Sequence, residues 1–528
     1  MPSRRESRRH ASTVKLSKSG AAPLEPGLRR FRRFCLVGAV LLLAGLFRFY
    51  NLDNAPPGLH SDEAADAIDA AEAARTGRFE VFYPGNNGRE GLYINTGALL
   101  LSGVAAVEPS PLHLEAWMAR LASALFGTLT VLGIFFLMRA LTDSDFAATA
   151  AAFFTAVSLW HLCLSRLGTR AVSSACFLVW ALFFLLWGFA KIARSPGWRG
   201  WLLLAVAGAV YGAGFHTYTA YRITPVIVLA ALIWLARGYR SSGHFRTWIA
   251  GAGLFLGMTL LVVSPLAFYF LQHPEKFSSR TAEVSILRSH TLWRDLAGNI
   301  GKTILMFNVA GDPNPRHNIA GRPEMFLPVG LLFLGGVALG IWRISRRSQT
   351  SWPFVLCFVW AAVGAVPAIL SNEGAPHALR SCLMIPPCFM LAALFADQVR
   401  LWAAPRLPRY VWPAAVAATV LVIGVEAWIS YFVIFAHDPR TVLNFQNQKA
   451  VIARRFAAMP DWVPKYFLVV GVQLDERGNP EGYENVALLT GGYTPAERAR
   501  RNIHFVTTTA EAQRARHTEG AVVWAIRE

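Results

Sequence analysis

The chain has 528 residues, of which 54% are hydrophobic and only 16% are charged, and its formal net charge is +19. Soluble proteins of this length carry nearer to a quarter of charged residues, so the composition excludes an ordinary soluble enzyme and favours an integral membrane protein. The positive charge does not indicate nucleic-acid binding, because the basic residues gather in a tail before Phe34 and in short clusters between apolar segments. Basic residues in these places orient membrane helices against an anionic inner leaflet.

Residues 1–33 form a basic tail, which we expect in the cytoplasm. The apolar run from Phe34 is predicted to be a retained signal anchor, because Arg48 to Asn54 offers no small-residue cleavage site. Ten further apolar segments of spanning length follow, beginning near Trp117, Phe146, Ala171, Trp201, Ile223, Trp248, Met325, Trp352, Cys382 and Tyr410. With the tail inside, every loop that follows an even-numbered segment is basic, as the positive-inside rule requires. The sequence therefore predicts an all-α membrane module of about eleven helices over residues 34–435.

The apolar stretch Leu92–Val107 is shorter than these segments. Its 16 residues would extend roughly 24 Å as a helix, less than a comfortable span needs. We therefore predict a juxtamembrane helix at the outer interface, within a first outer loop of about residues 51–116. A second large outer loop is expected over about residues 271–323. Two glycine pairs, Gly208/Gly212 and Gly253/Gly257, are expected to let their helices approach closely.

The tail from residue 436 to residue 528 has a different pattern, in which short apolar runs alternate with polar stretches. Such a pattern is typical of short strands, and about 90 residues suffice for a small domain. We predict an extracytoplasmic α/β domain with a helix at Pro495–Arg501 and strands at Tyr466–Val472, Val486–Leu489, Ile503–Thr507 and Ala521–Ile526.

The first outer loop contains the densest group of polar residues. Asp62 and Glu63 follow a Pro-Gly turn, and Arg89 and Glu90 lie further along the same loop. Adjacent carboxylates near an apolar surface can provide a base for proton abstraction or ligands for a metal. Alternatively, Asp62 merely caps the alanine-rich helix that follows it. Composition alone does not decide between these two interpretations.

Other outer loops carry basic and aromatic residues. Tyr218 and Arg222 follow the fifth segment, and His377 and Arg380 precede the tenth. Arginines at the outer face run against the positive-inside bias. Binding of a lipid phosphate would explain them, because a guanidinium can bind two phosphate oxygens, whereas arginines that snorkel to headgroups are the alternative. The loop Gly311–Asn318, with His317, is long enough to cover the same outer cavity.

With these features the chain resembles the GT-C membrane glycosyltransferases. Within that class it is most similar to the bacterial branch related to dolichyl-phosphate-mannose–protein mannosyltransferases and the lipid A aminoarabinose transferase. The resemblance covers roughly residues 30 to 435 and rests on the signal anchor, the Asp62-Glu63 pair in a long first loop and the outer loops with arginine and histidine. It implies an inverting enzyme of the plasma membrane, which transfers a sugar from a polyprenyl-phosphate donor to a protein, lipid or glycan acceptor on the outer face.

The resemblance also implies roles for single residues. Asp62 matches the general base, Glu63 completes the acidic pair, and Glu90 matches a second first-loop acidic residue more loosely. His377 and Arg380 lie on the side that resembles the phosphate-binding side, and the other expected substrate-binding residues are Arg89, Arg222, Tyr218 and His317. A divalent cation held by Asp62, Glu63 and Glu90 stays open.

Two other functions also stay open. A polyprenyl-linked polysaccharide ligase or polymerase would share the outer arginines and the lipid substrate. A transporter would share the many helices, but the sequence has no inverted repeat and few ionisable groups at mid-helix depth.

Overall fold

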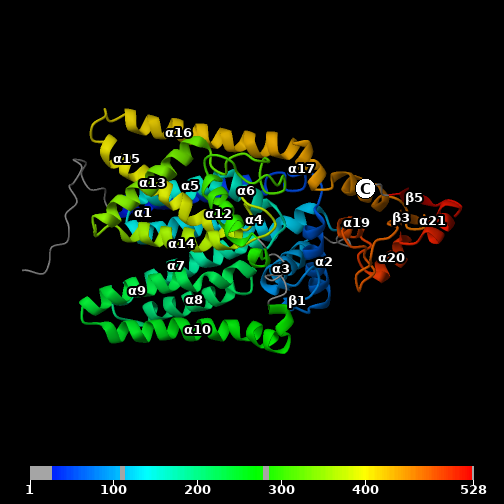
Figure 1. Ribbon diagram of the computed structural model, residues 1–528, viewed down its shortest axis with the longest axis horizontal. Helices are drawn as coiled ribbons and strands as arrows, with labels where there is room; N and C mark the ends of the chain where they lie inside the picture. Colours follow the sequence, from blue (N-terminus) through cyan, green and yellow to red (C-terminus); the bar gives the residue numbers. More distant parts are fainter. Residues whose placement is uncertain (1–25, 108–112, 278–284, 290, 526–528) are drawn as a thin grey trace, which may run out of the picture.

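The computed structural model describes residues 26–107, 113–277, 285–289 and 291–525. Most of the predicted basic tail lies outside these residues. Long helices run side by side through most of the molecule, and a smaller lobe with the C-terminus lies at one end of them (Figure 1). The predicted class, a helical membrane protein with a small C-terminal α/β lobe, is confirmed.

All eleven predicted apolar segments fold as helices. They are α1 (Pro26–Phe49), α4 (Ala116–Thr142), the bent pair α5 (Asp145–Val157) and α6 (Leu159–Arg166), α7 (Ala171–Arg194), α8 (Trp198–Gly214), α9 (Pro225–Ser241), α10 (Phe245–Gln272), α13 (Leu327–Ser345), α14 (Trp352–Ile369), α15 (Ile385–Ala403) and α16 (Val411–Trp428). Among the described residues, eight helices are long and apolar enough to cross a membrane, or nine if α5 and α6, bent by 59°, form one span. The other two segments fall outside this group, since α1 carries arginines near both ends and α8 has only 17 residues.

One of the two predicted glycine contacts is present. Helix α8 packs on α10, where a Cβ at Gly208 would collide with the carbonyl oxygen of Phe255 and one at Gly212 would lie 2.8 Å from that of Thr259. The prediction for Gly253 and Gly257 is wrong, because nothing lies within 4 Å of a Cβ built at either residue. Spacing alone does not say which face of a helix meets a neighbour.

The basic ends of the helices lie away from the C-terminal lobe. Arg32, Arg33 and Arg139 all pair with Asp145, at 3.2, 2.8 and 2.8 Å, which fastens α1 and α4 to the start of α5. The connections between α9 and α10 and between α15 and α16 lie at the end opposite the lobe (Figure 1). The helix bundle therefore has a basic end and an end that carries the lobe.

The first outer loop lies at the lobe end. It contains α2 (Ser61–Thr76), the antiparallel strands β1 (Phe82–Tyr83) and β2 (Arg89–Glu90), and α3 (Gly91–Val107), which packs on α2 and α4. The predicted short helix at Leu92–Val107 is therefore present as α3. Further along the chain, α12 (Leu292–Leu305) and the short 3₁₀ helices η1 (Thr219–Ile223), η2 (Ile286–Arg288) and η3 (Cys382–Met384) precede or connect the long helices.

The chain from residue 429 onwards leads from α16 into the C-terminal lobe. After η4 (Ile429–Ile434) and η5 (Phe435–His437) come α17 (Pro439–Asn444), α18 (Asn447–Ala457), β3 (Lys465–Leu468), α19 (Glu484–Leu489), α20 (Pro495–Arg501), β4 (Ile503–Val506), α21 (Thr509–Arg516) and β5 (Val522–Ala525). The three strands form a parallel sheet in the order β4-β3-β5. The strand predicted at Val486–Leu489 is wrong: this run belongs to the buried helix α19, and a short apolar run does not distinguish a buried helix from a buried strand.

The lobe is fastened to the first outer loop by polar contacts. Arg454 on α18 pairs with Asp53 at 3.0 Å and with Glu115 at 2.9 Å. The side chain of Asn485 on α19 donates to the carbonyl of Leu59 at 2.8 Å. These contacts fix the lobe beside the start of α2, where the Asp62-Glu63 pair lies.

Candidate active site

Helix α2 is capped by His60 and not by Asp62. The His60 ring accepts a hydrogen bond from the backbone N–H of Asp62, and Glu63 accepts one from the backbone N–H of His60 at 3.0 Å, which completes a capping box. The interpretation of Asp62 as the helix cap is therefore wrong. The Asp62 carboxylate does not cap the helix, so it can contact other groups.

The Asp62 side chain is half exposed, accepts hydrogen bonds from two side chains and lies 3.6 Å from the His60 ring. Arg316 donates to Oδ2 at 2.9 Å, and Asn86 donates to Oδ1 at 3.3 Å. Partial burial raises the pKa of Asp62, but His60, Arg316 and Asn86 lower it more, so it lies below the usual range. Burial and the charge of Arg316 lower the pKa of His60 to about 4. At neutral pH, Asp62 is therefore an ionised carboxylate beside a neutral imidazole.

Glu63 points away from Asp62 and into the protein. Its carboxylate is 1% exposed, pairs with the fully buried Arg120 at 3.2 Å, and accepts the backbone N–H of Gly168 at 2.6 Å. Arg120 also donates to the carbonyls of Leu52, Pro56 and Gly58. The two neighbouring acids thus occupy different environments, and Glu63 joins the start of α2 to α4 and to the turn after α6.

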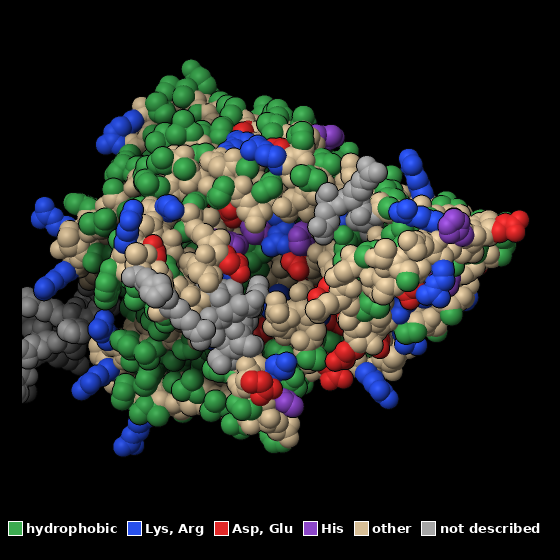
Figure 2. Space-filling model, turned by 45° about the vertical axis from the view of Figure 1, so that its right-hand side comes forward, with side chains coloured by type: hydrophobic (Ala, Val, Ile, Leu, Met, Phe, Trp, Pro, Cys, Tyr) green, Lys and Arg blue, Asp and Glu red, His purple; other side chains and the backbone are tan. Residues whose placement is uncertain are grey.

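A cavity of about 520 Å³ opens beside Asp62. Figure 2 shows acidic, basic and histidine side chains gathered around a hollow on this face, next to the C-terminal lobe. Six of the nine predicted site residues line the cavity: Asp62, Arg89, Tyr218, Arg222, His377 and Arg380. Glu63, Glu90 and His317 do not line it and lie buried behind it.

Glu90 holds two of the cavity arginines. It is 1% exposed, pairs with Arg222 at 3.1 Å and lies 3.7 Å from Arg170. Arg222 also donates to the carbonyl of Phe277 at 2.7 Å and lies over the ring of that residue. Glu90 therefore aims cationic groups at the cavity instead of facing it.

His317 belongs to a buried hydrogen-bonded cluster. Its Nδ1 lies 3.1 Å from Oδ2 of Asp312, and Arg316 Nε donates to its Nε2 at 3.1 Å. The His377 ring lies 5.2 Å from the ring of His317. Arg316 contacts both His317 and Asp62. The cluster therefore holds the Arg316 guanidinium beside the Asp62 carboxylate.

The cluster is also the only group in the described part of the chain with metal-ligand proximity. Asp312, His317 and His377 each bring one ligand atom within 4.8 Å of the others, whereas Asp62, Glu63 and Glu90 form no such group. Because Arg316 donates to Nε2 of His317, we place the ring proton on Nδ1, where it is donated to Asp312. A metal on Nδ1 would leave two N–H groups facing each other, so the contacts fit a hydrogen-bonded cluster better than a cation site.

The predicted residues His377 and Arg380 lie on the loop before η3. Arg380 pairs with Glu373, and His377 lines the cavity next to it. Burial and the neighbouring His317 lower the pKa of His377 to about 3. At neutral pH, His377 can therefore offer a ligand a hydrogen bond but no positive charge.

The cavity has an apolar side as well. Ile223, Leu287, Val366, Pro367 and Leu370 line it, and the last three lie at the end of α14. This side joins the polar site to the helices that span the membrane. The cavity therefore suits a ligand with a charged head and a hydrocarbon tail.

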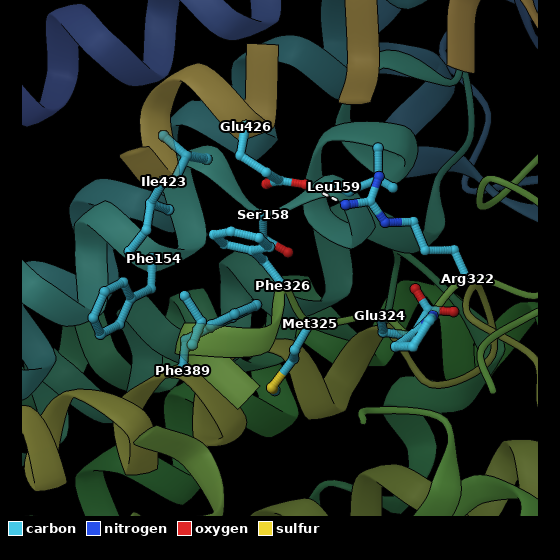
Figure 3. A pocket seen from close by; sticks show the side chains of 13 residues that line it. Phe154, Ser158, Leu159, Arg322, Glu324, Met325, Phe326, Phe389, Ile423 and Glu426 are labelled. Carbon is cyan, nitrogen blue, oxygen red and sulfur yellow. Dashed lines mark hydrogen bonds and ion pairs between the residues drawn. The ribbon is translucent and has the colours of Figure 1, made fainter. Parts of the chain in front are cut away.

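A second hollow lies where α5 breaks into α6, and Figure 3 shows its lining. It holds only about 20 Å³, room for about one water molecule. Arg322 reaches across it to an ion pair with Glu426 of α16. The hollow is too small for a substrate, and the ion pair ties α16 to the loop before α13.

The sequence interpretation missed Arg316 and Asp66, which both line the cavity. Arg316 lies in a loop that reads as a turn, and its contact with Asp62 spans 254 residues. Asp66 follows Asp62 by four residues, a spacing that puts both on one helix face. This spacing is the only signal for Asp66 in the sequence.

Comparison with known proteins shows what the chain is similar to. Residues 111–269 match the family model described as dolichyl-phosphate-mannose-protein mannosyltransferase. No curated protein matches the sequence. Among solved structures, the apo form of ArnT from Cupriavidus metallidurans is similar with a TM-score of 0.51 and 14% identity, over 94% of this chain and 93% of that one.

Two further structures show weaker similarity. ArnT bound to undecaprenyl phosphate has a TM-score of 0.49 and 16% identity, over 93% of this chain and 92% of that one. The oligosaccharyltransferase AglB from Archaeoglobus fulgidus, in complex with an inhibitory peptide and a dolichol-phosphate, has a TM-score of 0.48 and 12% identity over 92% of this chain. The present chain spans only 65% of that archaeal protein.

The resemblance that the sequence predicted is thus confirmed at the level of the class. The match of residues 111–269 to the mannosyltransferase family model and the fold shared with apo ArnT are what the chain has in common with membrane glycosyltransferases of the GT-C class.

Proposed function

We propose that the protein is an inverting glycosyltransferase, which moves a sugar from a polyprenyl-phosphate donor to an acceptor hydroxyl, with Asp62 as the general base. One observation carries this proposal. The ionised, half-exposed Asp62 faces a cavity that is lined by five arginines and also by apolar side chains. Such a cavity combines a proton acceptor, positive charge for an anionic leaving group and a surface for a lipid.

The donor phosphate would lie against Arg222 and Arg380. A guanidinium forms charge-assisted hydrogen bonds with phosphate oxygens, and both residues line the cavity. The polyprenyl chain would follow Val366 and Leu370 towards the membrane. The family model that matches residues 111–269 is described by a dolichyl-phosphate-linked sugar, which supports a donor of this class.

The proposed reaction is a single displacement. Asp62 accepts the proton of the acceptor hydroxyl as the oxygen forms its bond to the anomeric carbon. On the other side of that carbon, the bond to the phosphate oxygen breaks, and the polyprenyl phosphate leaves with the electron pair. The arginines stabilise the charge that develops on the leaving phosphate. One displacement inverts the configuration of the anomeric carbon.

The remaining residues serve this arrangement. Glu63 fixes the start of α2, Glu90 aims Arg170 and Arg222, and the cluster of Asp312 and His317 holds Arg316 beside Asp62. His377, which is neutral, would contribute a hydrogen bond to the donor. Tyr218 lies near Arg170, with the guanidinium 5.9 Å from the ring centre, and would help to position that arginine.

The orientation in the plasma membrane belongs to the same proposal. We place the tail of residues 1–33 in the cytoplasm, the membrane module of residues 34–435 across the bilayer and the domain of residues 436–528 outside. Supporting this, the basic connections lie at the end of the bundle opposite the C-terminal lobe (Figure 1), and the cavity is lined by Asp62 and Asp66 of α2, to which the lobe is fastened. The acceptor, whether protein, lipid or glycan, would then arrive from the outer face.

The test is a donor-consumption assay with purified protein in nanodiscs. Radiolabelled polyprenyl-phosphate sugars are incubated with candidate acceptors, and the release of polyprenyl phosphate and the anomeric configuration of the product are measured. We expect transfer from a polyprenyl monophosphate sugar with inversion. Transfer only from diphosphate-linked oligosaccharides would point to a ligase or polymerase. If no transfer occurs, the protein is reconstituted in sealed vesicles, and uptake of the labelled compound there would point to a transporter.

A further inference from the structure

Asp66 is a second carboxylate at the cavity. It lies one helical turn after Asp62 on α2, on the same face, and its side chain is 10% exposed. Both carboxylates line the cavity, together with Asn86, Asn87 and Thr169. This part of the lining therefore offers hydroxyl-binding groups next to the proposed base.

One carboxylate oxygen of Asp66 is held by an ion pair with Arg89. Arg89 pairs with Oδ1 of Asp66 and with Oδ2 of Asp69, and its Nε donates to the carbonyl of Gly85 at 3.2 Å. The other oxygen, Oδ2 of Asp66, accepts no hydrogen bond from any residue that the structure describes. Asp66 is thus a rigid carboxylate with one oxygen left to accept hydrogen bonds from a ligand.

The C-terminal lobe supports the same chain of charges. Arg477 pairs with Oδ1 of Asp69 at 2.7 Å and with Glu72 at 2.8 Å. A continuous series of ion pairs therefore runs from the lobe to the cavity, through Arg477, Asp69, Arg89 and Asp66. Each partner restricts the rotamers of the next, so the lobe helps to hold Asp66 in place.

A carboxylate here repels a phosphate but accepts hydrogen bonds from hydroxyl groups. In an inverting displacement, the base and the leaving phosphate lie on opposite sides of the anomeric carbon, so the sugar lies between Asp62 and the phosphate-binding arginines. The flank of that sugar would meet the helix face that carries Asp66. The chemistry of this flank fits a neutral sugar with free hydroxyl groups.

We propose that Asp66 binds hydroxyl groups of the donor sugar and so helps to select it, with Arg89 and Arg477 as positioning residues. This inference rests on the proposed function and adds a specificity site to it. It also gives the C-terminal lobe a role in the reaction, because the lobe supplies one of the positioning residues.

The test compares the binding of two lipids to purified protein in nanodiscs: undecaprenyl phosphate, and the same lipid carrying mannose, glucose or galactose. The measured quantity is the ratio of the two affinities for each sugar. Asp66→Asn should reduce this ratio about 10-fold to 100-fold for the sugar that the wild type prefers, the loss expected for hydrogen bonds to a charged group. Binding of undecaprenyl phosphate itself should change less than about 2-fold.

Two further variants separate sugar recognition from a general loss of structure. Arg477→Gln should lower the same ratio by a smaller factor, and Arg477→Lys should restore it by pairing with Asp69. The control is Asp438→Asn, which makes the same Asp-to-Asn change at a residue that pairs with Arg440 outside the cavity lining and should leave both affinities unchanged.

An unchanged ratio in Asp66→Asn, or an equal loss for both lipids, overturns the inference while the proposed function stands. If the wild type binds neither undecaprenyl phosphate nor its glycosides, the proposed function itself fails.

Discussion

Replacing Glu63 by glutamine should destabilise the protein, although its neighbour Asp62 tolerates the equivalent change. The Glu63 carboxylate accepts four hydrogen bonds: from His60 N at 3.0 Å, from Gly168 N at 2.6 Å, and from Arg120 at 3.2 and 3.3 Å. A glutamine has one acceptor oxygen, so its amide group would face donors where the second carboxylate oxygen stands.

The size of the effect follows from these contacts. Removing one partner of a buried ion pair costs about 3–5 kcal/mol, because the other charge stays buried and uncompensated. Arg120 keeps four backbone carbonyl acceptors, from Leu52, Asp53, Pro56 and Gly58, which reduce the loss. We therefore expect a loss near the lower end, about 3 kcal/mol. In Asp62→Asn, only half-exposed contacts change, and surface changes of this kind usually stay within about 0.5 kcal/mol.

Thermal unfolding of both purified variants in the same detergent, followed by tryptophan fluorescence, measures the difference. The melting temperature of Glu63→Gln should fall by several degrees, and that of Asp62→Asn should stay close to the wild type. The Glu63→Gln protein that remains folded should still transfer sugar. A Glu63→Gln variant as stable as the wild type but without turnover would refute this reasoning and make Glu63 a catalytic residue.

Three more predictions concern charge and topology. Arg316→Gln removes a cation that lowers the pKa of Asp62, so this pKa should rise and the acidic limb of kcat/KM should move to higher pH; an unmoved limb would contradict the contact. Arg380→Ala should weaken binding of undecaprenyl phosphate by about 1.5–3 kcal/mol, and an unchanged Kd would remove Arg380 from the phosphate site. With the one exposed native cysteine replaced by serine, a cysteine at Ser17 should be labelled from the cytoplasm and one at Glu476 from outside. Labelling of both from one side would overturn the orientation.

The fold could be predicted from the sequence where length and apolarity decide it. A run of some twenty apolar residues has few alternatives to a helix in a membrane, so the sequence predicts the eleven helical segments that begin between Phe34 and Tyr410. Prediction failed where the environment decides between two structures. Val486–Leu489 reads equally as strand or helix, and its burial against α2 and α18 selects the helix.

The sequence predicts many of the residues that line the candidate site, but it does not predict which side chains contact each other. The residue types of Asp62, Arg222 and Arg380 in predicted outer loops indicate a polar site, and all three residues line one cavity. That Glu63 faces Arg120, and that Arg316 faces Asp62, depends on how separate helices and loops meet. Local sequence patterns do not predict contacts between residues that are far apart in the chain.

The central claim is that Asp62 takes the proton of the acceptor, and turnover of purified Asp62→Asn tests it most directly. Asparagine keeps the shape of the side chain but cannot accept the proton, so the variant should fold, bind undecaprenyl phosphate as the wild type does, and lose turnover by roughly 10²–10⁴-fold. Turnover within a few-fold of the wild type would contradict the account.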